Sequence, residues 1–427
     1  MMDTKAVSLY KNISILILTL MSPCLLVDEV TASMGSPFIY RSAIMFNLLI
    51  LALLSLQSSK KWNFSKDQKT ILIYFVLAIG YYFILGITVY PGTGFTTKTP
   101  VKNLIMGIFI FVIINKQGFN LKRLSDLFVN LAFILSLLAV MQYALYYYDL
   151  IELERYILKS YSPGDYRYLG IGGFIDPDYM TGNIYRVESF WREPSRFAQF
   201  LQVPLFIAIY RFINKRVFGN MVVLTIIAVA FVLTYSVANY FSFIIALILF
   251  FSISRKDTLG NIKVFRRMVS LASIVVLVYL LTSFFTYTNT YKYQASKQVL
   301  EKRTSKQLVN RIERFVFASS VLDVSIFGDP TIRLNWDRNP SAIGMLFIWG
   351  GIPGVLLSFA YSRIFYSLVI RSMRKSRYSI IYAGSIAFFI AFNWYGSYFD
   401  TYFIFIMAFL SSYSRNESRY LISDPLT

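Results

Sequence analysis

The 427-residue chain contains no histidine and only one cysteine, Cys24. Without histidine, a Ser-His-Asp triad, a Cys-His pair and His-ligated zinc are all excluded. A single cysteine also rules out an internal disulfide and a thiolate metal site. Any chemistry that the chain performs must therefore come from arginine, carboxylate and aromatic side chains.

Charged residues are scarce as well, at 15% of the chain against about 25% in an ordinary soluble protein. Apolar residues make up 56%, and the mean hydropathy is +0.55. They gather in runs of about 15 to 25 residues, the length that crosses a hydrocarbon core of about 30 Å. The composition predicts an all-α polytopic integral membrane protein.

The apolar runs predict about 12 transmembrane helices. The continuous stretch at 220–254 is divided at Ser236, because about 35 residues are too many for one crossing. The first run lacks a small-residue cleavage site, so we expect an uncleaved span rather than a signal peptide. The predicted spans are 12–28, 42–57, 70–90, 101–116, 126–148, 197–214, 220–235, 237–254, 268–287, 341–362, 378–395 and 399–414.

The distribution of lysine and arginine predicts the orientation of these spans. With the N-terminus in the cytoplasm, the inside segments hold 24 of the 42 basic residues and 6 of the 22 acidic residues. The inside then carries a net charge of +18 and the outside +2, so the formal charge of +20 is almost entirely a topology signal. Both termini are expected in the cytoplasm. No soluble segment carries a basic stripe with interleaved aromatics, which argues against nucleic-acid binding.

Two outside segments are long, and the other loops are short. Loops of this length are usually functional. Both contain short helical patterns, and we expect them to form a folded cap on the outer face. The predicted parts are helices one to five at 1–148, the first large outer loop at 149–196, helices six to nine at 197–287, the second large outer loop at 288–340, and helices ten to twelve with a cytoplasmic tail at 341–427.

The spans carry no charge near their middles, whereas ion-coupled transporters usually place an ionisable group there. The outer charges concentrate instead in residues 186–200, RVESFWREPSRFAQF, just before an apolar run. Charges beside a bilayer are costly and usually functional. Arginine binds phosphate oxygens in pairs, so arginines at a membrane surface suit the pyrophosphate of a lipid carrier. The 32 tyrosines suit sugar faces, but most fit the aromatic belts of a membrane interface.

Three motifs carry a resemblance to a known family. Arg186, followed eight residues later by Pro194 within F-x-x-E-P-S-x-F-A, resembles the first motif of the bacterial Wzy-type O-antigen and capsule polymerases and of the related O-antigen ligases. The run RIERFVFASSVLDVSIFG, from Arg311 to Gly328, is similar to their second motif, an arginine that starts a loop helix ending in a glycine turn. The run GMLFIWGGIPGVLLSF is similar to the glycine-rich span that follows. The resemblance covers residues 186–360 by motif and the whole chain by layout.

This resemblance implies a GT-C-like glycosyltransferase at the periplasmic face of a bacterial inner membrane. The enzyme would transfer a growing glycan from undecaprenyl pyrophosphate to the non-reducing end of another lipid-linked repeat unit, with inversion of the anomeric carbon. The product would be O-antigen, capsule or a related surface polysaccharide. The resemblance implies no metal and no cofactor. The expected partners are the lipid-linked oligosaccharide donor and acceptor, the lipid bilayer and a chain-length regulator protein.

The chain departs from the family pattern at two places. The ligases carry a histidine just before the glycine-rich span, where this chain has Asp337-Arg338-Asn339-Pro340. The lack of histidine favours a polymerase over a ligase and leaves the catalytic base unassigned. The relatives also often place a basic residue after the serine of Thr234-Tyr235-Ser236, where this chain has Val237.

The candidate site residues each have a structural alternative. Asp337 and Glu193 are the candidate catalytic carboxylates that would deprotonate the acceptor hydroxyl. Asp337 could equally be a solvated loop acid, and Glu193 a helix-start acid before Pro194. The candidate pyrophosphate ligands could instead be ion-paired loop arginines or interfacial anchors. These ligands are Arg186, Arg192, Arg196, Arg311 and Arg314.

Three other functions compete with the polymerase. An O-antigen ligase differs only in its acceptor. A lipid-linked oligosaccharide flippase should have a polar cavity through its spans and short loops, which is the reverse of this pattern. A solute transporter is disfavoured by the uncharged midplanes.

Overall fold

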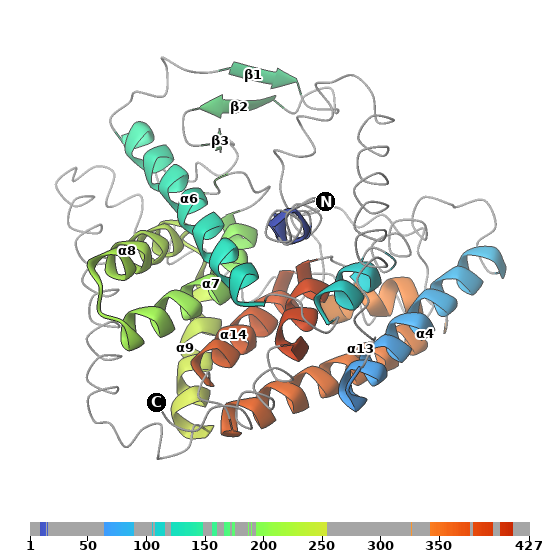
Figure 1. The fold of residues 1–427 in the computed structure, drawn as a ribbon. Coiled ribbons are helices and arrows are strands. Elements are labelled where there is room, and N and C mark those ends of the chain that lie inside the picture. The colour runs from blue at the N-terminus through green and yellow to red at the C-terminus, as the bar shows by residue number, and fades with distance from the viewer. Residues whose placement is uncertain are drawn as a thin grey trace, which may run out of the picture.

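The computed structural model describes a little under half of the chain. The described residues are 9–13, 15, 64–88, 105, 107–115, 121–147, 156–159, 166–170, 173–175, 187, 189, 194–253, 326, 342–375, 379–395 and 402–412. Most of these residues are helical, and three short strands lie between the helices in sequence (Figure 1).

Seven labelled helices and two further helical segments form the described bundle. The helices are α4 (Lys66–Thr88), α6 (Leu121–Tyr147), α7 (Pro194–Asn214), α8 (Phe218–Leu233), α9 (Val237–Ile253), α13 (Ala342–Lys375) and α14 (Ser379–Tyr395). Residues 107–114 and Tyr402–Ser412 are helical too, and a shorter helical stretch covers residues 9–13. The nine longer elements overlap nine of the predicted spans, while the spans at 12–28, 42–57 and 268–287 lie largely or wholly outside the described residues.

Three of these helices are long and apolar enough to cross a membrane. They cover Leu121–Ala144, Pro194–Asn214 and Gly350–Arg374. Shorter apolar helices cover Phe218–Leu233, Ala238–Phe250, Ile380–Ala391 and Tyr402–Ser412. The described part of the chain is therefore mainly helical, and its long apolar helices indicate a membrane protein.

The apolar stretch at 220–254 breaks where the sequence predicted. α8 ends at Leu233 and α9 begins at Val237, with Tyr235 between them in the left-handed region at φ 47°. A non-glycine residue with positive φ cannot continue a helix, so the backbone turns there. The carbonyl of Ser236 then accepts hydrogen bonds from the N–H groups of Asn239 and Tyr240 and starts α9.

Three short stretches of the predicted first outer loop are strands, whereas the sequence predicted short helices in this loop. They form an antiparallel sheet of three strands, β1 (Tyr156–Lys159), β2 (Tyr166–Gly170) and β3 (Gly173–Ile175), in the order β1-β2-β3. The strands are rich in tyrosine and other residues of high strand propensity. Gly170 pairs with Gly173 across only two intervening residues, so these glycines belong to a hairpin. The sheet lies near the C-terminal end of α6, and β3 contacts that helix (Figure 1).

Aromatic side chains hold the centre of the bundle together. The ring of Phe128 on α6 makes edge contacts with Phe200 on α7 at 5.6 Å and with Phe405 at 5.4 Å between ring centroids. All three rings are fully buried. Such pairs contribute about 0.5–1.5 kcal/mol beyond the area that they bury. α14 packs on α7 so closely that a Cβ atom on Gly384 would lie 2.6 Å from the Cβ of Phe206.

Polar side chains join helices at a different level. Gln68 on α4 donates to Asn115 at 2.5 Å, and the hydroxyl of Ser411 donates to the same Asn115 oxygen at 3.0 Å. Arg211 on α7 pairs with Asp126 on α6 at 2.5 Å, and Arg371 on α13 pairs with Asp67 on α4 at 3.2 Å. Each of these residues lies at a helix end that the charge pattern assigns to the cytoplasm.

Candidate functional site

Most of the predicted site residues lie outside the described part of the chain. These are Arg186, Arg192, Glu193, Arg311, Arg314 and Asp337. Arg196 is described, and it lies partly buried in the first turn of α7. The structure does describe the backbone next to several of these residues, and this backbone defines the candidate site.

Val187 and Ser189, which follow Arg186 in the sequence, are each hydrogen-bonded to a different helix. The N–H of Val187 donates to the carbonyl of Leu233 at the end of α8, at 3.2 Å. The N–H of Ser189 donates to the side-chain oxygen of Gln142 near the end of α6, also at 3.2 Å. Val187 and Ser189 are fully buried, and Ser189 has a left-handed φ of 52°. The chain therefore crosses the ends of α6 and α8 before it enters α7.

α7 begins at Pro194, as expected for a proline in the first helical position. Ser195, Gln199 and Gln202 follow at intervals of four and three residues, so they lie on one face of the helix. All three are buried in an otherwise apolar helix. This polar stripe, Ser195-Gln199-Gln202, was not among the sequence predictions. Its helical spacing within the apolar run from Phe197 was the signal that could have revealed it.

Asn239 on α9 is the centre of the contacts made by the polar stripe. Its amide nitrogen donates to the carbonyl of Ser195 at 3.0 Å and to the hydroxyl of Ser236 at 2.7 Å. The amide nitrogen of Gln202 donates to the side-chain oxygen of Asn239 at 2.9 Å. Gln202 and Asn239 are both fully buried. The network joins the start of α7 to the α8–α9 break.

Three buried atoms at this end of the bundle retain free hydrogen-bonding capacity. Within the described part of the chain, the amide nitrogen of Gln199, the amide oxygen of Gln202 and the hydroxyl of Ser189 have no hydrogen-bond partner. Buried polar groups are normally satisfied, so such atoms require an explanation. A neutral set of donors and acceptors can bind the hydroxyl groups of a sugar.

The glycine-rich span contains a break in the helix. Gly351 in α13 has φ 57° and ψ −154°, a conformation that is essentially restricted to glycine. The break frees the N–H of Ile352, which donates to the carbonyl of Ile326 at 3.0 Å. On the other side of the break, the hydroxyl of Tyr81 on α4 donates to the carbonyl of Gly350. Ile326 lies two residues before Gly328, so the second motif and the glycine-rich span are in contact.

Among the described residues, no cluster of three or more histidine, cysteine, aspartate or glutamate side chains could hold a metal ion. The described polar groups at the candidate site are amides, hydroxyls, backbone groups and the Arg196 guanidinium. These groups can form hydrogen bonds with a ligand.

Comparison with known proteins finds no family model that matches the chain and no match among curated proteins.

Proposed function

We propose that the protein is a membrane glycosyltransferase that polymerises lipid-linked repeat units at the outer face of the bacterial inner membrane. It transfers a growing glycan from undecaprenyl pyrophosphate to the non-reducing end of a second lipid-linked unit. The observation that carries the proposal is the anchoring of the segment after Arg186. Val187 and Ser189 fix it on α8 and α6, next to a helix start with buried, unsatisfied amide and hydroxyl groups.

In the proposed reaction, an acceptor hydroxyl oxygen attacks the anomeric carbon of the donor glycan. A new C–O glycosidic bond forms, and the bond from the anomeric carbon to the pyrophosphate oxygen breaks. The hydroxyl proton passes to a carboxylate, for which Asp337 and Glu193 are the candidates. Arg186, Arg192, Arg196, Arg311 and Arg314 are proposed to bind the pyrophosphate and stabilise its growing charge.

The polar stripe of α7 is proposed to orient the sugar next to the pyrophosphate. The Gln199 amide nitrogen can donate to a sugar hydroxyl, and the Gln202 amide oxygen can accept from one. Asn239 holds Gln202 at 2.9 Å and so fixes the face on which the sugar would lie. A polymerase and a ligase would share this arrangement. The absence of histidine before the glycine-rich span favours the polymerase.

The decisive experiment uses purified full-length protein and a lipid-linked repeat unit. A polymerase should produce a ladder of glycan lengths, resolved by gel electrophoresis or mass spectrometry. A ligase would not produce such a ladder with any repeat unit. It would transfer the glycan to a lipid A core acceptor instead. If several authentic repeat units give no ladder, the proposed function is wrong.

Matched arginine variants test the proposed site separately. Arg186→Ala and Arg311→Ala should abolish the ladder, because each removes a charge-assisted contact to the leaving group. Arg167→Ala in β2 and Arg303→Ala in the second loop make the same change outside the motifs and should retain it. A ladder that survives Arg186→Ala and Arg311→Ala would contradict the site but not the function.

A further inference from the structure

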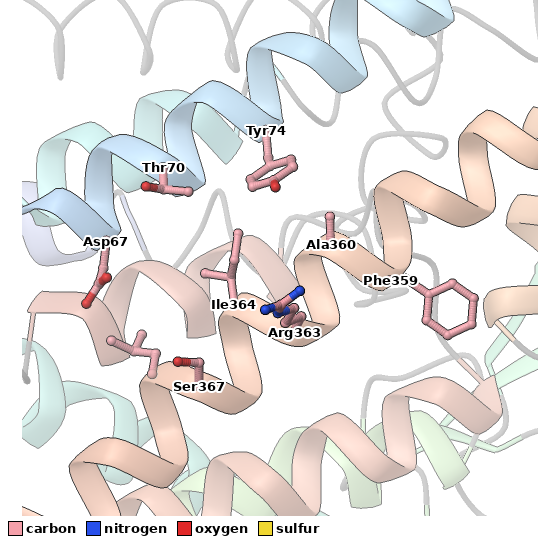
Figure 2. Close-up of a pocket in the computed structure, with 9 residues that line it drawn as sticks. Asp67, Thr70, Tyr74, Phe359, Ala360, Arg363, Ile364 and Ser367 are labelled. Carbon is pink, nitrogen blue, oxygen red and sulfur yellow. The ribbon is translucent and has the colours of Figure 1, made fainter.

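A second site lies between α4 and α13. Two polar contacts join these helices, the ion pair of Asp67 with Arg371 and the hydrogen bond from Tyr81 to Gly350. Between these contacts is a pocket of about 450 Å³ (Figure 2). It is lined by Asp67, Thr70, Tyr74, Phe359, Ala360, Arg363, Ile364, Ser367 and Leu368. None of these residues belongs to the candidate glycosyltransferase site.

The lining changes from polar to apolar along the pocket. Asp67 and Ser367 lie at the end nearest the ion pair, while Phe359 and Ala360 lie toward the middle of the helices. Arg363 lies between these two ends on α13, and Figure 2 shows it beside Ile364, on the helix opposite Thr70 and Tyr74 of α4. A ligand that fits this lining has an anionic head and an apolar tail.

Arg363 is available to an anionic partner at this position. It is exposed, and the described structure gives it no hydrogen bond or ion pair. The Asp67 carboxylate is already paired with Arg371 at 3.2 Å. Thr70 uses its hydroxyl proton in a bond to the carbonyl of Lys66. Ser367 accepts a hydrogen bond from Arg371 at 3.4 Å and keeps its own proton for a ligand.

The surroundings of the pocket identify the ligand as a membrane lipid. Both helices expose large apolar side chains beside it, on faces that suit acyl chains: Ile73, Val76, Leu77, Leu356 and Phe359. The segment of α13 that carries Arg363 is long and apolar enough to span a membrane. Lys66 and Lys69 on α4 add positive charge near the polar end. Basic clusters at a membrane surface attract anionic lipids.

We propose that the α4–α13 pocket binds one anionic glycerophospholipid of the surrounding leaflet. The lipid phosphate accepts hydrogen bonds from the Arg363 guanidinium and the Ser367 hydroxyl, and an acyl chain lies along Ala360 and Phe359. The ion pair of Asp67 with Arg371 neutralises the carboxylate that would otherwise repel the phosphate. The bound lipid joins α4 to α13 where these helices are otherwise separated by the pocket.

The test uses full-length protein in detergent with defined lipids and native mass spectrometry. The protein should retain one phosphatidylglycerol more strongly than phosphatidylethanolamine. Arg363→Gln should weaken retention about tenfold or more, because a charge-assisted hydrogen bond is lost. Arg374→Gln removes the same charge from an exposed position of the same helix outside the pocket, and should retain the lipid like the unmodified protein.

Two further variants test the two halves of the pocket without a change of charge. Ala360→Phe should reduce lipid retention by filling the space for the acyl chain. Arg363→Lys keeps the positive charge and should recover part of the retention lost in Arg363→Gln. Equal retention by Arg363→Gln and Arg374→Gln would overturn the proposal. Equal retention of phosphatidylglycerol and phosphatidylethanolamine would contradict the preference for an anionic headgroup. Displacement of the lipid by millimolar pyrophosphate would assign the site to a soluble phosphate instead.

Discussion

The hydroxyl of Tyr402 donates a hydrogen bond to the carbonyl of Phe200 at 3.0 Å, within the buried centre of the bundle. This carbonyl belongs to the residue four positions before Pro204, a proline inside α7. Proline has no N–H, so it cannot form the helical hydrogen bond to that carbonyl. A side chain from the Tyr402–Ser412 helix replaces the missing donor, which is how membrane helices tolerate interior prolines.

Tyr402→Phe should therefore destabilise the protein by about 1–3 kcal/mol, because the Phe200 carbonyl is left buried without a donor. Thermal unfolding in detergent measures the effect. In the Pro204→Ala background the helix regains its own N–H, so the same Tyr402→Phe change should have a smaller effect. Equal effects in both backgrounds would show that the tyrosine hydroxyl does not compensate for the proline.

Gly351→Ala should distort the break in α13. A side chain at φ 57° and ψ −154° costs about 1–3 kcal/mol, and relaxation into a regular helix would withdraw the Ile352 N–H from the Ile326 carbonyl. We expect a lower unfolding temperature and a weaker glycan ladder. Gly80→Ala in α4 is the control, because a Cβ there meets no atom within 4 Å. A Gly351→Ala variant as stable and active as Gly80→Ala would contradict a role for the break.

Asn239→Ala should loosen the start of α7 from α9. The change removes the partner of the buried Gln202 amide and costs about 1–3 kcal/mol. If the polar stripe orients the sugar, the variant should also shorten the glycan ladder at temperatures where it remains folded. Asn214→Ala serves as the control, since Asn214 is exposed and its side-chain amide donates a local hydrogen bond to the carbonyl of Tyr210. A normal ladder from folded Asn239→Ala would separate the stripe from catalysis.

The sequence predicted the helices well because hydropathy is a local property. The start of α7 at Pro194 and the break at Ser236 each depend on a few adjacent residues. α13 extends beyond the predicted end at 362 to Lys375, because leaving the hydrocarbon does not end a helix. The strands at 156–175 were missed because four-residue segments carry little periodicity.

The contacts of the candidate site depend on tertiary structure, so no local pattern could predict them. Asn239 and Ser195 are 44 residues apart in sequence, and Ile352 and Ile326 are 26 apart. Charge and motif drew attention to Arg186 and its neighbours, whereas the described site is built largely from neutral amides and hydroxyls. Hydrogen-bonding side chains inside an apolar helix, such as Gln199 and Gln202, give a weaker signal than charges do.

The single cysteine makes the predicted orientation testable with a membrane-impermeant maleimide. In a Cys24→Ser background, Val217→Cys and Ile326→Cys introduce one thiol each at exposed aliphatic positions, 59% and 66% exposed. Val217 joins α7 to α8 beside Lys215 and Arg216, in a segment predicted to be cytoplasmic, while Ile326 lies in the second loop that is predicted to be outside. In sealed right-side-out vesicles, the reagent should label Ile326→Cys at once and Val217→Cys only after the membrane is opened. Immediate labelling at Val217→Cys alone would show that the orientation is the opposite of the predicted one. The stripe of Ser195, Gln199 and Gln202 would then lie on the cytoplasmic face, which contradicts polymerisation at the outer face.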